Sequence, residues 1–197
     1  MLTQFSGAVY PTVFVIYAVN RYGWTTGAVG LCMAGFGVCS GLVQATLTGR
    51  AADKFGERKV ILFGLICGAI GMGVFGLANS SLGFALAIPI STLAGIAGPA
   101  IMAMMTRRVE PWEQGQLQGA NTALQSVAGI VAPLLFGWTY SLFIGPFRGV
   151  NMQGAPFMLA AVFMVISIVL CWLTFNLRGG DVEPVTAAAP APQGLAH

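Results

Sequence analysis

Charged residues are scarce in this chain, making up 8% of its 197 residues, and its longest apolar stretches contain none. Histidine occurs once, at His197, and the four cysteines form no CxxC pair. Acid–base catalysis and metal binding both need titratable or ligating side chains placed together. We therefore expect no enzyme, no metal site and no cofactor. The net charge of +3 is too small to indicate a nucleic-acid partner.

Apolar residues, in contrast, make up 56% of the chain. A helix needs about 20 apolar residues to cross a bilayer, and continuous apolar runs predict helices because barrel strands alternate polar and apolar residues. The sequence predicts six spans, at Leu2–Val19, Thr26–Leu47, Val60–Ala78, Leu82–Met105, Leu117–Ile144 and Pro156–Leu177. We expect an all-α membrane protein in a lipid bilayer, with a transmembrane domain over residues 1–178. Residues 179–197 are rich in Ala, Pro and Gly, and we expect a disordered cytoplasmic tail there.

The basic residues are divided unevenly between the two sides that six spans create. One side receives seven of them, Arg50, Lys54, Arg58, Lys59, Arg107, Arg108 and Arg178, and the other side receives only Arg21 and Arg148. Cytoplasmic loops of membrane proteins carry an excess of Lys and Arg. The asymmetry predicts an integral membrane protein with both termini in the cytoplasm.

Glycine is frequent, with 27 residues, and two GxxxG pairs lie within spans, Gly37–Gly41 and Gly64–Gly68. Small residues four apart let helices approach closely. The pairs are either packing positions or smooth surfaces along which helices move. Bends are expected at the prolines within the spans, Pro11, Pro89, Pro99 and Pro133.

A charged loop with the sequence GRAADKFGERK, residues 49–59, joins the second and third spans. We expect Gly49 and Gly56 to allow a tight reversal of the chain. Asp53 can cap a helix end or pair with Arg50 or Arg58. From these residues alone, the loop is either a turn that fixes topology or a functional element.

A single polar stripe runs along the otherwise apolar fifth span. Its members recur at helical spacing, at Gln114, Gln118, Asn121, Thr122 and Gln125. Uncharged polar side chains in a membrane face protein or a water-filled cavity rather than lipid. The stripe therefore either forms hydrogen bonds between helices or, from Gln118 to Gln125, lines a substrate path. Tyr17 in the first span is a further candidate for that lining.

Three segments resemble the major facilitator superfamily of transporters. GRAADKFGERK resembles the G-x-x-x-D-x-x-G-x-[RK]-[RK] signature between the second and third spans of each six-helix half. EQGQLQG at 113–119 and APLLFGWTY at 132–140 are similar to the eleventh span of the tetracycline-resistance drug:proton antiporters. NRYGW at 20–24 is similar to the junction between their spans seven and eight. The resemblance covers roughly residues 11–177, with the segments in the right order.

The resemblance implies the C-terminal half of a twelve-span transporter, made of two inverted three-helix repeats, with the substrate bound between the halves. The implied function is secondary active transport, as part of a multidrug or tetracycline-like drug:proton efflux antiporter of the bacterial inner membrane. The implied substrate is a small apolar or amphipathic drug-like molecule. The implied protein partner is the N-terminal half or a second copy of this chain.

The resemblance also assigns roles to individual residues. In the family, the acid of the loop belongs to a cytoplasmic gate, which corresponds here to Asp53. The supporting positions of that motif are Gly49, Arg50, Gly56, Arg58 and Lys59. Glu57 stands where the family often has a base, so we expect a weaker local charge network. Gln44 joins the substrate-path candidates because the tetracycline pumps have a matching glutamine.

The positions at which some tetracycline pumps carry a histidine and an aspartate fall on Ser40 and Gly68. Neither residue titrates, and proton coupling needs a group that changes charge. We therefore expect that this chain does not itself carry the coupling proton. Two alternatives remain open, a truncated membrane remnant that transports nothing and a half-size transporter that acts only as a dimer.

Overall fold

The structure, a computed structural model, describes residues 2–78, 80–146 and 152–177, and these are helical throughout apart from short connections. The helices are α1 (Leu2–Gly7), α2 (Val9–Tyr22), α3 (Thr26–Thr46), α4 (Thr48–Phe55), α5 (Glu57–Leu77), α6 (Ser81–Thr92), the 3₁₀ helix η1 (Leu93–Ile96), α7 (Ala97–Thr106), α8 (Gln114–Ile144) and α9 (Ala155–Leu177). Six segments are long and apolar enough to cross a membrane: Leu2–Tyr22, Thr26–Thr46, Glu57–Leu77, Ser81–Thr106, Gln114–Ile144 and Ala155–Leu177. The all-α, six-helix prediction is confirmed. The expected tail at 179–197 and the basic residues Arg148 and Arg178 lie outside the described residues.

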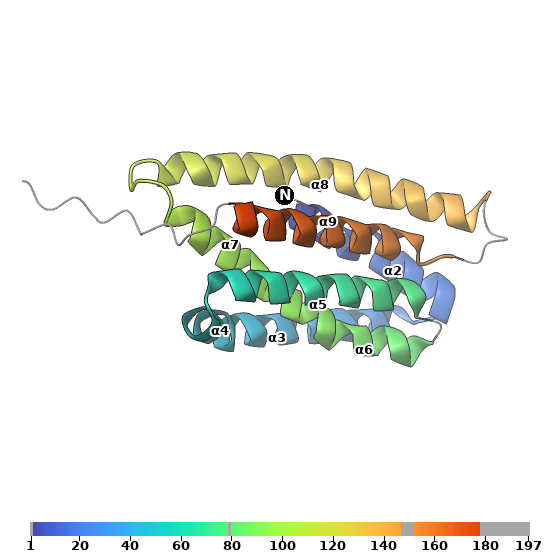
Figure 1. Cartoon of the computed structure of the whole chain (residues 1–197). Helices are drawn as coiled ribbons and strands as arrows, with labels where there is room; N and C mark the ends of the chain where they lie inside the picture. The colour runs from blue at the N-terminus through green and yellow to red at the C-terminus, as the bar shows by residue number, and fades with distance from the viewer. Residues whose placement is uncertain (1, 79, 147–151, 178–197) are drawn as a thin grey trace, which may run out of the picture.

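The helices lie side by side along one common direction (Figure 1). α4 and the connection from α7 to α8 lie at one end of the bundle, and the α2–α3 and α5–α6 connections lie at the other. The bases at 50–59 and 107–108 therefore share an end, which we call the basic end, and Arg21 lies at the opposite end. This is the alternation that the charge pattern predicts for six spans.

Two spans are interrupted. The first breaks at Ala8, between α1 and α2, and the fourth changes to a 3₁₀ helix at η1, between α6 and α7. Pro89 lies inside α6, four residues before η1 begins, and its carbonyl oxygen accepts a hydrogen bond from the Thr92 hydroxyl at 2.8 Å. A proline removes one backbone donor, but its position alone does not fix where a 3₁₀ turn begins. Pro133, in contrast, lies within an uninterrupted α8.

α5 is the central helix, and small residues on one of its faces let the fourth span and α9 approach closely. A Cβ atom at Gly64 would lie 3.0 Å from the Ala97 Cβ, and one at Gly68 would lie 3.0 Å from the Met164 Cε. Gly71 lies directly against the Ser91 side chain. The packing interpretation of the Gly64–Gly68 pair is therefore supported by these contacts.

The Gly37–Gly41 pair on α3 does not pack in this way. Nothing lies within 4 Å of where a Cβ would stand at either position. Packing at Gly37 and Gly41 is not observed among the described residues, because no described helix covers the face of α3 that carries them. A glycine spacing identifies a face but does not identify what covers it.

Aromatic side chains fill the interior near the end opposite the basic end. Tyr17, Phe75, Phe84 and Phe157 are fully buried, with ring centroids 4.7 Å apart for Phe75 and Phe84 and 5.4 Å apart for Tyr17 and Phe157. Such pairs add to the free energy of burial by about 0.5–1.5 kcal/mol each. The aromatic cluster holds α2, α5, α6 and α9 together.

The segment NRYGW closes this aromatic cluster with hydrogen bonds. The Tyr22 hydroxyl donates to the Ala78 carbonyl oxygen at 2.7 Å, and the Trp24 Nε1 donates to the Ser81 Oγ at 2.5 Å. Gly23 ends α2 with φ of 65°, a left-handed conformation that glycine adopts without strain. The segment therefore joins the first span to the hairpin between the third and fourth spans.

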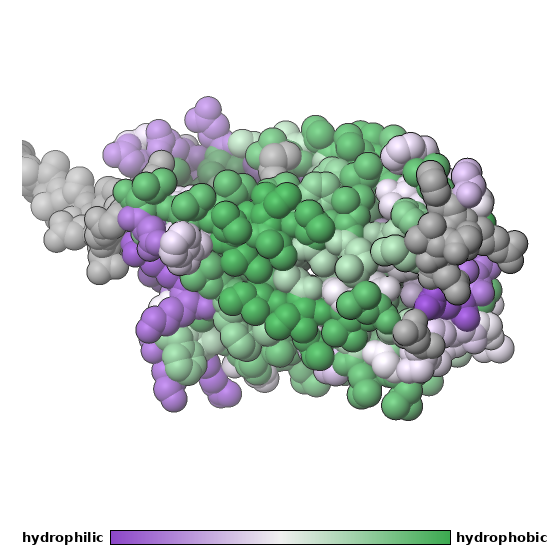
Figure 2. All heavy atoms as spheres, turned by 45° about the vertical axis from the view of Figure 1, so that its right-hand side comes forward, coloured by the Kyte–Doolittle hydropathy of each residue, from purple (hydrophilic) through white to green (hydrophobic). Residues whose placement is uncertain are grey.

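Large apolar side chains also cover the outside of the bundle. Leu31, Leu82, Leu134 and Ile130 are each at least 67% exposed, and Phe63 is 51% exposed. Figure 2 shows apolar side chains across the middle of the face in view, with hydrophilic ones toward the two ends. This pattern suits a bilayer, in which apolar side chains face lipid.

Candidate functional site

The polar stripe of the fifth span lies on the half of α8 that packs least against the bundle. α8 buries Ala128, Ala132, Phe136 and Tyr140, at intervals of four, and none of its earlier residues is buried. Gln118, Thr122 and Gln125 are exposed, and Asn121 is half-buried. Within the described part of the chain, none of these side chains forms a hydrogen bond with another helix, so the interhelical hydrogen-bonding role is not observed there.

α3 offers a second uncovered surface. Of its residues, all of which the structure describes, only Val29 is buried. Gln44 is exposed, and its Nε2 lies 3.8 Å from where a Cβ would stand at Gly95 in η1. The structure thus places Gln44 beside the irregular part of the fourth span, while the polar stripe lies on α8.

A cavity of about 310 Å³ lies between the first span, α3, α5 and η1. Its polar lining comes from Thr3, Gln4, Tyr10, Ser40, Ser91 and Thr92. Ser91 is only 4% exposed. The cavity thus gathers uncharged polar side chains from four different helices inside an otherwise apolar bundle.

The same cavity brings together Ser40 and Gly68, the two positions where the resemblance places titratable residues in some tetracycline pumps. Sequence reasoning missed four other polar members, Thr3, Gln4, Ser91 and Thr92. The signal for the latter two was present, since they form a polar pair just after Pro89 in an otherwise apolar span.

Tyr17, a substrate-path candidate from the sequence, lies elsewhere. It is 0% exposed within the aromatic cluster, where its ring packs against Tyr22 and Phe84. The Arg21 guanidinium carbon lies 5.8 Å from the centre of its ring. In this structure Tyr17 is a core residue, and it is not among the residues that line the 310 Å³ cavity.

The loop at 49–59 is mostly helical. α4 covers Thr48–Phe55, so Gly49 lies inside a helix, and the expectation that it helps to reverse the chain is wrong. Gly56 makes the reversal alone, with φ of 82° and ψ of 148°, a region that other residues rarely adopt.

The charges of this loop pair differently from the expectation. Asp53 is exposed, and within the described residues its carboxylate makes no ion pair, so pairing with Arg50 or Arg58 is not observed. Glu57 instead pairs with Arg107 at the end of α7, with Nη2 and Oε1 3.3 Å apart. Arg107 is a site residue that sequence reasoning missed, because the two residues are 50 positions apart.

The chain as a whole matches a known protein family. The family model described as Major Facilitator Superfamily matches residues 1–197. The chain belongs to the Major Facilitator Superfamily. The match extends over the whole chain and confirms the resemblance that the three sequence segments indicate.

Curated relatives within this family are drug-resistance proteins. The class G tetracycline resistance protein of Vibrio anguillarum is 36% identical over 151 residues, which are 75% of this chain and 38% of that protein. The class B tetracycline resistance protein of Escherichia coli is 36% identical over 141 residues, 70% of this chain and 34% of that protein. The multidrug resistance protein MdtH of Aeromonas hydrophila is 32% identical over 127 residues, 61% of this chain and 30% of that protein.

The chain therefore spans less than two fifths of the length of these curated relatives. A chain of this family with six membrane-length helices is an integral membrane protein, and the organisms of the relatives are bacterial. The family is one of transporters rather than enzymes.

Proposed function

We propose that this chain is the C-terminal six-helix half of a drug:proton efflux antiporter. In this proposal, a second six-helix half covers the exposed faces of α3 and α8, and the two halves rock about a substrate site near the midplane. The open polar stripe of α8 is the observation that carries the proposal. Gln118, Thr122 and Gln125 find no partner on another helix among the described residues, and an uncharged polar row facing lipid is unfavourable.

The candidate substrate path combines three surfaces of the chain. The first is the polar stripe from Gln118 to Gln125, the second is Gln44 on α3, and the third is the 310 Å³ cavity that contains Ser40 and Ser91. None of these surfaces carries a fixed charge, so they favour a small apolar or amphipathic molecule over a strongly ionic one. Tetracycline is the first probe because several relatives are named tetracycline resistance proteins.

The orientation of the chain follows from the charge distribution. Six described bases, Arg50, Lys54, Arg58, Lys59, Arg107 and Arg108, lie at the basic end, against Arg21 at the other. The positive-inside rule favours a cytoplasmic position for the basic end. The loop with Asp53 then lies where a cytoplasmic gate would meet the second half. The Asp53 carboxylate, exposed and without an ion pair among the described residues, is available for that contact.

The coupling proton is assigned to the other half. The lining of the 310 Å³ cavity includes no Asp, Glu, His or Lys, and Ser40 and Gly68 hold the positions where related pumps carry titratable groups. A group that changes charge is needed for proton coupling. The second half must therefore supply it.

A second candidate function rests on the same exposed faces. If no N-terminal half exists, α3 and α8 can be covered by another copy of this chain, which gives a half-size transporter that acts as a dimer. A third outcome is a membrane remnant that associates but transports nothing. All three possibilities predict that the faces of α3 and α8 are covered, but they differ in transport.

Drug accumulation in efflux-deficient bacteria separates these possibilities. The chain is expressed alone and together with the N-terminal six-helix half of a tetracycline-resistance relative, and cellular tetracycline is followed by its fluorescence. We expect lower accumulation only when both halves are present, and an uncoupler should abolish the difference. Export by the chain alone would support the dimer. Absence of export, while the relative's own C-terminal half restores it with the same partner, would support the remnant.

A further inference from the structure

A cavity of about 610 Å³ opens at the basic end, between the turn that joins α4 to α5 and the end of α7. Its wall includes Gly56, Arg58 and Lys59 from the turn, and Met104 and Arg108 from the end of α7. This cavity is distinct from the polar stripe of α8 and from the 310 Å³ cavity beside η1. Its lining combines charged side chains with the apolar side chain of Met104.

The lining of this basic cavity has an excess of positive charge. Its four bases are Arg58, Lys59, Arg107 and Arg108, and its two acids are Asp53 and Glu57. Glu57 is committed to Arg107, at 3.3 Å, so the pair contributes little net charge. Lys59 and Arg108 are exposed, and the described residues give neither an ion pair. An anion can therefore enter without displacing an existing pair.

Part of the cavity is held in place by packing. The Arg58 guanidinium carbon lies 5.6 Å from the centre of the Phe175 ring on α9, a cation–π contact that fixes its position. The ion pair of Glu57 with Arg107 ties the start of α5 to the end of α7. The bases thus converge from two helices whose relative position is already set, which lowers the entropy lost on binding.

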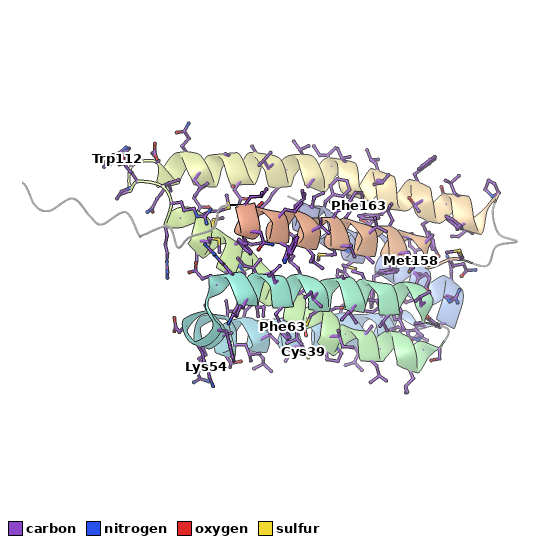
Figure 3. All side chains as sticks on the ribbon, viewed as in Figure 1. Cys39, Lys54, Phe63, Trp112, Met158 and Phe163 are labelled. Carbon is purple, nitrogen blue, oxygen red and sulfur yellow. The ribbon has the colours of Figure 1, made fainter. Side chains whose placement is uncertain are left out.

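The cavity lies at the level where lipid headgroups begin. The apolar part of α5 starts at Val60, directly after Lys59, and Phe55, which lines the cavity, is 57% exposed. Trp112, at the same end of the bundle, is 76% exposed. Figure 3 shows Lys54 and Trp112 at this same end of the bundle. Exposed aromatic side chains prefer the interface between water and hydrocarbon.

We propose that this basic cavity binds the phosphate of an anionic phospholipid from the leaflet at the basic end. Basic pockets between membrane helices suit lipid phosphates because the headgroup brings a negative charge to the rim while the acyl chains stay in the bilayer. Lys59, Arg108 and Arg58 hold the phosphate, and Met104 contacts the apolar part of the lipid. The proposal does not depend on which molecule the protein transports.

The test measures lipid binding to the full chain purified in a neutral detergent. Fluorescently labelled phosphatidylglycerol and phosphatidylcholine are titrated at about 0.3 M salt, where screening removes the influence of distant charges. We expect phosphatidylglycerol to bind at least tenfold more tightly. Equal affinity for the two lipids would overturn the proposal.

Charge variants locate the site. Lys59→Gln and Arg108→Gln should each weaken phosphatidylglycerol binding about fivefold, the effect expected for one base near a lipid headgroup. Lys54→Gln is the matched control, because Lys54 belongs to the same loop but does not line the cavity. It should change binding less than twofold. Equal losses in Lys54→Gln and Lys59→Gln would show general attraction to a basic surface and would overturn the site.

Two further measurements separate lipid binding from loss of folding and from binding of free phosphate. Glu57→Gln removes a negative charge from the rim and releases Arg107, so it should tighten binding, an outcome that loss of folding cannot produce. Inorganic phosphate at millimolar concentration should displace the labelled lipid only weakly. If free phosphate binds the chain as tightly as the lipid does, the ligand is a soluble anion, and the lipid proposal is wrong.

Discussion

The Asn20 Nδ2 donates a hydrogen bond to the Tyr140 hydroxyl oxygen, at 3.3 Å, and the same hydroxyl lies 3.4 Å from the Ile16 carbonyl oxygen, to which it donates. Asn20 belongs to NRYGW and Tyr140 to APLLFGWTY, two of the segments that carry the resemblance to the family. The contact anchors the second half of α8 to α2 while the first half, with the polar stripe, stays uncovered.

Replacing Tyr140 with Phe should weaken the attachment of α8. The change removes one hydroxyl and leaves the Asn20 side-chain donor without this partner, so we expect a loss of about 1 kcal/mol of stability. Thr139→Val is the control, since the Thr139 hydroxyl donates to the Leu135 carbonyl of its own helix and has no other partner among the described residues. Thermal unfolding in detergent measures both. Equal effects on the unfolding temperature would contradict a specific role of Tyr140.

Adding a methyl group at Gly71 should destabilise the bundle. A Cβ there would clash with Ser91, including its Cα, at 3.0 Å, and overpacking of this kind costs about 1–3 kcal/mol. Gly73→Ala is the matched control on the same helix, because nothing lies within 4 Å of that position. It should be neutral or stabilise by up to about 1 kcal/mol, as alanine favours helix. The unfolding temperatures of the two variants are compared. The account predicts a lower unfolding temperature for Gly71→Ala and an unchanged or higher one for Gly73→Ala.

Much of the fold follows from the sequence alone. Six continuous apolar runs indicate six helical spans, because only helices and closed barrels satisfy the backbone in lipid and barrel strands alternate polar and apolar residues. The breaks were less predictable, since Pro89 precedes a 3₁₀ helix while Pro133 leaves α8 uninterrupted. The difference depends on packing around each proline, which local sequence does not specify.

The candidate site was predicted in part. Helical spacing identifies the polar stripe of α8. The sequence does not distinguish an aromatic residue that faces a cavity from one in the core, and Tyr17, a candidate for the substrate path, is fully buried. Arg107 was missed because its partner, Glu57, lies far away in the sequence. Ser91 was missed because its position beside Ser40 in a cavity depends on the break at η1.

The proposed orientation predicts which end of the helix bundle an impermeant thiol reagent can reach in intact cells. The reporters are Thr26→Cys and Lys54→Cys, both at exposed positions, in a version whose four native cysteines are replaced by alanine. Thr26→Cys should react in intact cells, and Lys54→Cys should react only after the membrane is opened. The reverse pattern would place the basic end outside and refute a cytoplasmic gate at Asp53.

The assignment of the coupling proton to the other half predicts no proton release from this chain alone. Tetracycline is added to the purified chain in weakly buffered solution, and the pH is followed with an indicator dye. Since Ser40 and Gly68 do not titrate, we expect no change above the blank. A release that saturates with one proton per chain would show that this half contains the coupling group.

Water access to the polar stripe tests the central claim most directly. Gln125→Cys and Ile130→Cys are made on α8 in the cysteine-free version, expressed with the N-terminal partner half and treated in membranes with a water-soluble thiol reagent. Both side chains are exposed in this chain, but Gln125 belongs to the stripe, and Ile130 lies on another face. A substrate path predicts that Gln125→Cys reacts, that drug slows the reaction, and that Ile130→Cys does not react. Equal reactivity at the two positions, or none at Gln125→Cys, would contradict a water-filled path along α8.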